Sequence, residues 1–256
     1  MSLDGKIVFI TGASAGIGAA TALAFAAEGA RLLLAARRAG KLAEIASLAL
    51  ERGAPGVHSI DLDVRDRRAV QNAIDTLPPD WAEIDVLVNN AGLSRGLDRL
   101  YMGKIDDWDE MIDTNVKGLL YVTRAVVPGM VVRRQGHIVN LGSTAGEVTY
   151  PSGAVYCATK AAEHALNDGL RQDLLGTPVR VTSIDPGMVQ TDFSLIRFHG
   201  DEERAANVYK GITPLTPEDV AEAIVWAVAR PPHVNIARVV LTSINQANSL
   251  LFHRQN

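Results

Sequence analysis

Short apolar runs alternate with longer amphipathic stretches along almost the whole chain. The runs predict strands of a parallel sheet, because most of them are too uniformly apolar for a sheet with one solvated face. The longer stretches have helical periodicity and are rich in Ala, Leu, Glu and Lys. We expect strands at 7–11, 31–35, 57–61, 86–89, 137–141, 179–184 and 239–242, and helices at 17–28, 39–51, 67–77, 108–132, 155–175 and 217–229.

This alternation of strand and helix predicts the architecture of the chain. Strands that alternate with helices predict an α/β doubly wound Rossmann fold, with about seven parallel strands and helices on both faces. No repeat or linker divides the sequence, so we expect one domain over residues 1–256. The irregular stretch at about 186–217 follows a strand, on the side where such sheets bind ligands, and is the expected substrate loop.

Composition narrows the class of partner. The 256-residue chain is 47% hydrophobic and 21% charged, as in a globular domain and unlike a disordered protein. Its net charge of -4 comes from interspersed residues, so no charge block in the sequence indicates nucleic acid or an anionic membrane as the partner. A small-molecule substrate is therefore expected, and no metal site is predicted.

Cysteine content and the start of the chain predict the compartment. Cys157 is the single cysteine, which excludes an intramolecular disulfide and suits a reducing compartment. Residues 1–6 contain no apolar signal core, and no run reaches the ~18 apolar residues that span a bilayer. We expect a cytoplasmic protein.

A glycine-rich turn follows the first expected strand. Glycines there allow a tight turn and a close approach to a pyrophosphate, and the helix that follows offers free N–H groups and a positive dipole end. The alternative to a dinucleotide site is a tight turn between strand and helix that binds no ligand. The residues expected to bind a dinucleotide here are Gly12, Ser14, Gly16, Ile17 and Gly18.

The end of the second expected strand predicts which dinucleotide binds. An acid is absent from this position in the sequence, and Arg37 with Arg38 can bind a 2′-phosphate through charge-assisted hydrogen bonds. NADP(H) is therefore the expected cofactor, although these arginines could simply be solvated at a helix start. Asp63 with Val64 could hold the adenine, or Asp63 could cap the next helix.

Tyr156 and Lys160 lie four residues apart on one expected helix. Residues at this spacing share a helix face, so the ammonium can lie close to the phenol and favour its phenolate. Such a pair suits proton transfer to or from an alcohol oxygen. The spacing alone is weak evidence for catalysis, because a tyrosine and a lysine occur at this spacing by chance on many helices.

Several motifs together resemble the short-chain dehydrogenase/reductase superfamily, over essentially the whole chain. They are Thr11 to Gly18, Asn89-Asn90-Ala91-Gly92, Asn115, Ser143, Tyr156 with Lys160, and Pro186-Gly187. The resemblance implies that Tyr156 is the proton donor or acceptor and that Lys160 lowers its pKa and holds the nicotinamide ribose. It implies that Ser143 binds the substrate oxygen and that Asn115 interrupts a helix and binds a relay water. The further cofactor residues it implies are Asn90, Ala91, Gly92, Pro186, Gly187, Val189 and Thr191.

Within this superfamily the chain most resembles NADP-dependent 3-hydroxy acid dehydrogenases, including serine and allo-threonine dehydrogenases. Segments 35–38, 140–143, 150–158, 193–197, 207–211, 216–221 and 245–247 carry this resemblance. It implies interconversion of small 3-hydroxy acids and the corresponding carbonyl compounds, while residues 93–96 depart from related sequences near the substrate mouth. A broad aldehyde or ketone reductase is the first alternative, and a non-catalytic NADP sensor or structural subunit is the second.

A hydroxy acid needs a cation for its carboxylate, because a buried carboxylate demands a paired partner. Arg197 is the first candidate and Arg95 the second, although Arg197 could equally be an exposed charge or part of a subunit contact. Members of the superfamily are commonly dimers or tetramers, so a homo-oligomer is expected, with a tetramer favoured.

Overall fold

The computed structural model describes residues 2–255 and contains, over that range, one sheet of seven parallel strands in the order β3-β2-β1-β4-β5-β6-β7. The strands are β1 Ile7–Thr11, β2 Arg31–Ala36, β3 Val57–Asp61, β4 Val86–Asn89, β5 Gly136–Leu141, β6 Val179–Pro186 and β7 Arg238–Leu241. The α/β prediction is confirmed, and all seven expected strands form with ends within two residues of the prediction.

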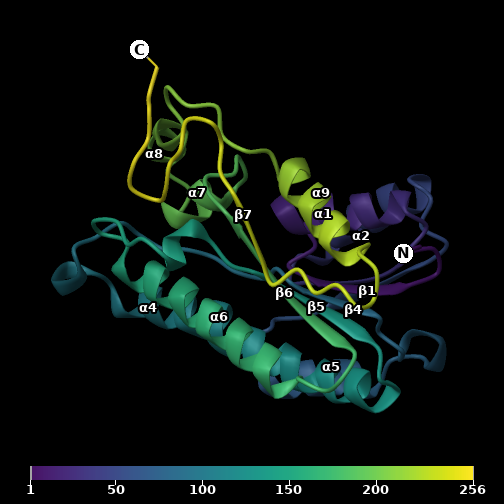
Figure 1. The fold of residues 1–256 in the computed structure, drawn as a ribbon. Coiled ribbons are helices and arrows are strands. Elements are labelled where there is room, and N and C mark those ends of the chain that lie inside the picture. Colours follow the sequence, from purple (N-terminus) through teal and green to yellow (C-terminus); the bar gives the residue numbers. More distant parts are fainter. Residues whose placement is uncertain (1, 256) are drawn as a thin grey trace.

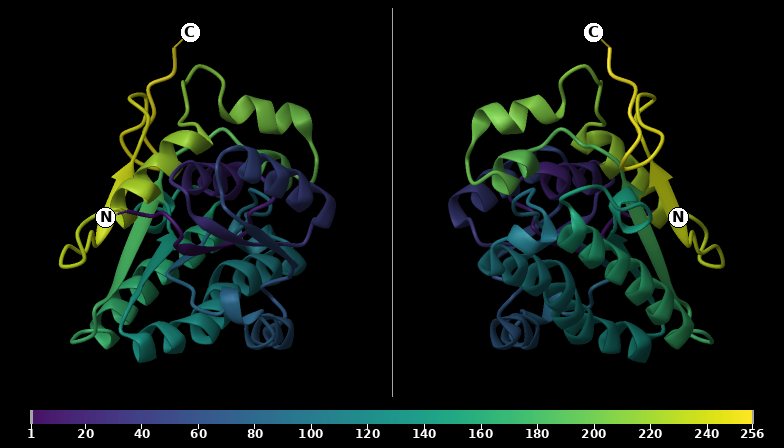
Figure 2. Two further views of the ribbon diagram at one scale, coloured as in Figure 1. Left: turned by 90° about the vertical axis from the view of Figure 1, so that its right-hand side faces the viewer. Right: turned by 90° about the vertical axis from the view of Figure 1, so that its left-hand side faces the viewer.

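The helices cover both faces of this sheet (Figures 1 and 2). The helices are α1 Gly16–Ala27, α2 Ala39–Glu51, α3 Arg67–Asp75, α4 Ile105–Ile112, α5 Leu119–Arg133, α6 Ala154–Asp173, α7 Phe193–Arg197, α8 Glu202–Val208 and α9 Pro217–Val228. Helices α1, α2 and α9 pack on one face, while α3, α5 and α6 pack on the other.

The uniformly apolar strands supply both hydrophobic cores. In β1, Val8 and Ile10 belong to the core under α1, α2 and α9, whereas Ile7 and Phe9 belong to the core on the opposite face. Successive side chains of a strand point to opposite faces, so a strand buried on both sides has no polar alternation. Burial on both faces explains why the inner strands can be predicted from apolar runs in the sequence.

The sheet reverses its order at β1. This strand pairs with β2 on one side and with β4 on the other, and the chain winds outward in both directions from there. Connections leave the carboxyl ends of β1 and β4 toward opposite faces, which opens a crevice between them. The fold thus places a ligand site above these strand ends.

The prediction of one helix over 108–132 was wrong in its middle. Helix α4 ends at Ile112, the segment η3 Asp113–Gly118 is a π-helical turn, and α5 then begins at Leu119. The side chain of Asn115 bonds to the Leu93 backbone and to Thr159, contacts far away in sequence. Periodicity within one segment does not report such contacts, although the family resemblance did imply an interruption here.

The stretch expected to be irregular at 186–217 contains two short helices, α7 and α8. Asp201 caps α8 by accepting a hydrogen bond from the Arg204 amide. Figure 1 shows both helices on the side of the sheet where the C-terminal segment also lies. Within residues 2–255, the structure contains no helix long and apolar enough to cross a membrane.

Candidate active site

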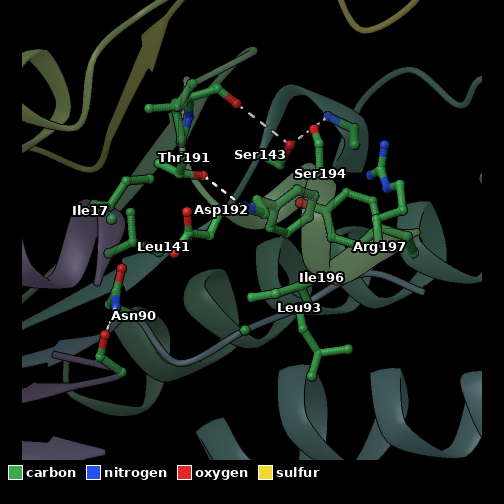
Figure 3. Close-up of a pocket in the computed structure, with 18 of the residues that line it drawn as sticks. Ile17, Asn90, Leu93, Leu141, Ser143, Thr191, Asp192, Ser194, Ile196 and Arg197 are labelled. Atoms are coloured by element: carbon green, nitrogen blue, oxygen red, sulfur yellow. Dashed lines mark hydrogen bonds between the residues drawn. The ribbon is translucent and has the colours of Figure 1, made fainter. Parts of the chain in front are cut away.

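A pocket of about 710 Å³ lies above the carboxyl ends of the strands. Its size is that of a typical ligand site. Its lining comes from the turn after β1, the ends of β2, β4, β5 and β6, helices α6 and α7, and the C-terminal segment. Figure 3 shows Arg197 at one end of this pocket and Ile17 with Asn90 at the other. One pocket therefore collects residues from most of the chain.

The glycine turn after β1 forms one end of the pocket. Gly12 and Gly16 have φ values of +66° and +53°, which glycine adopts without strain. A Cβ on Gly18 would lie 2.4 Å from the Gly12 carbonyl oxygen and 2.4 Å from Asn90 Nδ2, so a side chain has no room there. Asn90 Nδ2 also donates to the Thr11 carbonyl at 2.8 Å and ties the turn to the end of β4.

The N-terminus of α1 opens into the pocket. No side chain within the described residues caps it, whereas Asp66 caps α3 and Thr216 caps α9. Its first-turn amides therefore remain available for an anionic group, as at other helix N-termini that bind phosphate. The close approach at Gly18 and this open helix end together fit a dinucleotide pyrophosphate.

Two arginines stand at the end of β2. Arg38 donates from Nη2 to Ser14 Oγ at 3.1 Å, and both residues line the pocket. Arg37 also lines it, with Nη1 3.9 Å from Glu110 Oε1. Two guanidiniums and a hydroxyl at this point fit a 2′-phosphate.

Asp63 and Val64 line the same end of the pocket, but Asp63 does not cap the next helix. The cap of α3 is Asp66. Asp63 instead accepts hydrogen bonds from Arg65, including one of 2.6 Å from Nη2. Burial raises the pKa of the Asp63 carboxyl, but the bonds to Arg65 outweigh it and leave this pKa below its usual value. The helix-cap alternative was therefore wrong, because the next acid along the chain fills that role.

Tyr156 and Lys160 both line the pocket from α6. The Lys160 Nζ lies 5.9 Å from the centroid of the Tyr156 ring. It donates to the Leu141 carbonyl at 2.8 Å and lies 2.7 Å from Glu163 Oε2. The spacing correctly placed lysine and tyrosine on one face, but it missed the carboxylate. Glu163 follows Lys160 by three residues, a spacing that could have revealed it.

Ser143 and Asn115 are placed beside this pair. Ser143 lies after β5, where its Oγ accepts from the Ala145 amide at 3.1 Å and lines the pocket. Asn115 is fully buried behind the pocket; its Oδ1 accepts from the Leu93 amide at 2.9 Å and its Nδ2 donates to Thr159 Oγ1 at 3.0 Å. Burial of a fully bonded amide fixes the path of the chain after β4.

Arg197 reaches into the pocket from α7. Its Nε donates to Ser94 Oγ at 3.1 Å and its Nη2 donates to Tyr150 Oη at 3.0 Å. Its guanidinium carbon lies 5.4 Å from the centroid of the Tyr156 ring. Among the described residues, no carboxylate forms an ion pair with Arg197. A guanidinium whose partners are neutral hydroxyls can accept a carboxylate from a ligand.

Arg95 lines the pocket but is bound differently. Its Nε lies 2.6 Å from Glu110 Oε2, and its Nη1 donates to the Ile196 carbonyl at 2.5 Å. Burial raises the pKa of Glu110, yet the stronger effect of the Arg95 hydrogen bond holds this pKa below its usual value. The charge of Arg95 is therefore already compensated, which makes it the weaker of the two candidates for a substrate carboxylate.

The remaining predicted residues also line the pocket: Asn90, Ala91 and Gly92 after β4, and Pro186, Gly187, Val189 and Thr191 after β6. The sequence analysis gave no site role to Tyr150 or Phe193, although both line the pocket and lie in segments that carry the family resemblance. It likewise gave no site role to Gln246, which comes from the C-terminal segment, lines the pocket and accepts a hydrogen bond from the Met188 amide at 2.8 Å. No local pattern marks a residue that reaches a site from 58 positions away.

Comparisons with known proteins agree with this geometry. A family model described as short chain dehydrogenase matches residues 6–199. The chain is 48% identical over 242 residues to the NADP-dependent 3-hydroxy acid dehydrogenase YdfG of Salmonella typhi, covering 94% of this chain and 96% of that one. It is 43% identical to an NADP-dependent 3-hydroxy acid dehydrogenase of Schizosaccharomyces pombe, with 99% and 98% covered. The closed form of a serine dehydrogenase complexed with NADP⁺ superposes with a TM-score of 0.90 at 45% identity, with 97% and 100% covered.

Proposed function

This chain belongs to the short-chain dehydrogenase/reductase family, and on that premise we propose that it interconverts small 3-hydroxy acids of the serine, allo-threonine or 3-hydroxyisobutyrate type with their carbonyl counterparts. It is an oxidoreductase that acts on CH–OH groups and uses NADP(H). The observation that carries the substrate class is Arg197, a guanidinium without a carboxylate partner beside the Tyr156 ring.

The cofactor end of the pocket supports the binding of NADP(H). The turn at Gly12 to Gly18 and the open start of α1 would hold the pyrophosphate, and Arg37, Arg38 and Ser14 would hold the 2′-phosphate. Lys160 would hold the nicotinamide ribose, and residues after β4 and β6 would line the ring. When bound, the cofactor supplies or accepts the hydride.

The protein side of the reaction needs a proton donor and a hydrogen bond to one oxygen. Tyr156 would hold the proton that the substrate oxygen gains on reduction or loses on oxidation. Ser143 would donate to the same oxygen, whose negative charge grows during hydride transfer, so that this bond is strongest in the transition state. Both side chains line the pocket that contains Arg197.

Arg197 would bind the substrate carboxylate with the two donors that now bond to Ser94 and Tyr150. The planar guanidinium matches a carboxylate through two parallel hydrogen bonds. Tyr150 is partly buried, and burial raises the pKa of its phenol although Arg197 opposes the rise, so Tyr150 stays neutral and leaves the arginine charge uncompensated.

Arg197→Met tests this substrate class. Removal of the guanidinium is expected to raise KM for a 3-hydroxy acid by about tenfold or more, because the loss of even one of its two hydrogen bonds to the charged carboxylate has an effect of this size. The KM for a neutral ketone of similar size should stay near that of the wild type. Steady-state kinetics with both substrates measure the difference, and an equal loss on both would favour a broad carbonyl reductase instead.

Arg38→Leu tests the cofactor preference. We expect KM for NADP⁺ to rise about tenfold, because one charge-assisted bond to the 2′-phosphate is lost, while KM for NAD⁺ changes little. Arg52→Leu removes an exposed arginine outside the pocket and serves as the control. A similar rise for NAD⁺ and NADP⁺ would contradict the assignment of Arg38.

We further propose that the protein works in the cytoplasm as a homo-oligomer, with a tetramer favoured. Its single cysteine, Cys157, is free and buried, which suits a reducing compartment. Tyr101 and Met102, before α4, are 77% and 69% exposed, and apolar side chains grouped in this way are typical of subunit contacts. Light scattering of the purified protein measures its mass in solution, and the mass of a monomer would contradict the oligomer. Cell fractionation measures its location, and recovery outside the cytoplasmic fraction would contradict the compartment.

We also propose that residues 1–256 act as one domain, with residues 186–217 as its substrate loop. Support comes from Thr191 and Arg197, both of which lie in this segment and line the pocket. Limited proteolysis should cut this loop more slowly when NADP⁺ and a hydroxy acid are bound, and unchanged cutting would count against the loop assignment.

A further inference from the structure

The ammonium of Lys160 is almost completely enclosed by protein. Lys160 is 6% exposed, and its Nζ has the Leu141 carbonyl at 2.8 Å and the Glu163 carboxylate at 2.7 Å. An ammonium in such a place loses most of its hydration and is stable only when it is paired and hydrogen-bonded. The carboxylate of Glu163 supplies the pairing.

Glu163 itself is a buried acid, 3% exposed, on the same face of α6 as Tyr156 and Lys160. Burial raises the pKa of its carboxyl to about 7, against the opposing effect of Lys160. A lone carboxylate at this depth would be costly, so the carboxyl ionises from about pH 7 upward only because Lys160 pairs with it.

The charged surroundings identify Glu163 as the main partner of Lys160. The other titratable groups around the pair come from α6, β6 and β7, and they are Tyr156, His164, Asp185 and Arg238. Asp185 is already bonded to Ser183 Oγ at 2.6 Å and lies 3.2 Å from His164, besides its pair with Arg238. The turn η3 contributes the neutral Asn115.

The balance of charge at Lys160 depends on this partner. Burial lowers the pKa of the Lys160 ammonium, but Glu163, followed by Tyr156, outweighs burial and holds this pKa above its usual value. Without the Glu163 charge, the effect of burial would dominate, and buried lysines then lose their proton at much lower pH.

We propose that Glu163 is a positioning residue, whose buried carboxylate keeps the Lys160 ammonium charged and fixes it against the cofactor part of the pocket. This inference rests on the proposed function only in so far as Lys160 holds the nicotinamide ribose. Glu163 reaches neither substrate nor cofactor, because it is not among the residues that line the pocket, and it acts through Lys160.

The test is the affinity for NADPH as a function of pH, measured by NADPH fluorescence with the wild type and with Glu163→Gln. Above the lowered Lys160 pKa, the affinity of E163Q should fall by up to about tenfold for each pH unit, because the bound state needs the lysine proton. The wild type should hold its affinity to a higher pH. The gap between the two proteins therefore widens as the pH rises from 7.

Two further variants sharpen this test. Asp168→Asn removes an exposed carboxylate from the same helix, one that pairs with Arg171, and should follow the wild-type curve. Glu163→Asp keeps the charge but draws it back from Lys160, so its affinity should begin to fall at a pH between those of E163Q and the wild type. If E163Q does not fold, the comparison of E163D with the wild type carries the test.

Two results would overturn the proposal. A loss of affinity in E163Q that is the same at every pH indicates a purely structural role. An unchanged curve in E163Q, or in E163D where E163Q does not fold, indicates no role. The titration uses NADPH without substrate, so it tests the role of Glu163 in cofactor binding even if the enzyme turns over no hydroxy acid. Absence of turnover by the wild type would instead count against the proposed function.

Discussion

Tyr156→Phe is expected to lower kcat by about 10²–10⁴-fold, the usual contribution of a positioned acid or base, while NADPH binding stays nearly unchanged. Tyr156 is 9% exposed and its ring packs edge-on against Phe193 at 5.5 Å, so phenylalanine can keep these contacts. The change removes one hydroxyl and leaves the pocket shape intact. Steady-state rates and NADPH fluorescence titrations of the same preparation measure the two effects.

The control for this variant is Tyr101→Phe, which removes a hydroxyl from a tyrosine that is 77% exposed and outside the pocket. Its kcat should match that of the wild type. A Tyr156→Phe enzyme that keeps its turnover would remove Tyr156 from the chemistry. A wild type that binds NADPH but turns over no alcohol or carbonyl would favour the non-catalytic NADP sensor.

Gly18→Ala is expected to weaken NADP(H) binding by about 100-fold and to lower the free energy of unfolding by about 1–3 kcal/mol, as for other overpacked sites. The added Cβ would lie 2.4 Å from the Gly12 carbonyl oxygen, and this backbone cannot give way without moving the turn. The same turn presents the amides that are proposed to bind the pyrophosphate. Fluorescence titration and thermal unfolding measure the two losses.

Gly169→Ala is the matched control, since Gly169 lies inside α6 and an added Cβ meets no atom within 4 Å. Alanine is the better helix former by roughly 1 kcal/mol, so this variant should be as stable as the wild type or more stable. If Gly18→Ala binds NADPH as the wild type does, the turn is not the pyrophosphate site.

The five inner strands could be predicted from the sequence because each is buried on both faces and therefore forms an apolar run, whereas the edge strands β3 and β7 are only partly buried. The glycine turn and the placing of Tyr156 and Lys160 on one face of α6 could be predicted for a related reason, since both depend on local geometry. Gly12 needs a positive φ, and Tyr156 and Lys160 share a helix face by spacing alone.

Contacts between distant segments could not be read in this way. The π-helical turn depends on the hydrogen bonds of Asn115 to Leu93 and Thr159. The positive charge of Arg95 is compensated by Glu110, which lies on another element. Glu163 is an intermediate case, because its spacing from Lys160 was visible but its burial was not. Only the packed fold shows that a helical acid has become the partner of a lysine in the pocket.

The most direct test of the central claim is a spectrophotometric assay of the purified protein with NADP⁺ and, in turn, L-serine, D-threonine, L-allo-threonine and 3-hydroxyisobutyrate. NADPH oxidation with simple ketones is followed in parallel. We predict NADPH formation with at least one of the hydroxy acids, and a lower kcat/KM when NAD⁺ replaces NADP⁺. Activity on bulky neutral ketones alone, with none on any hydroxy acid, would contradict the account.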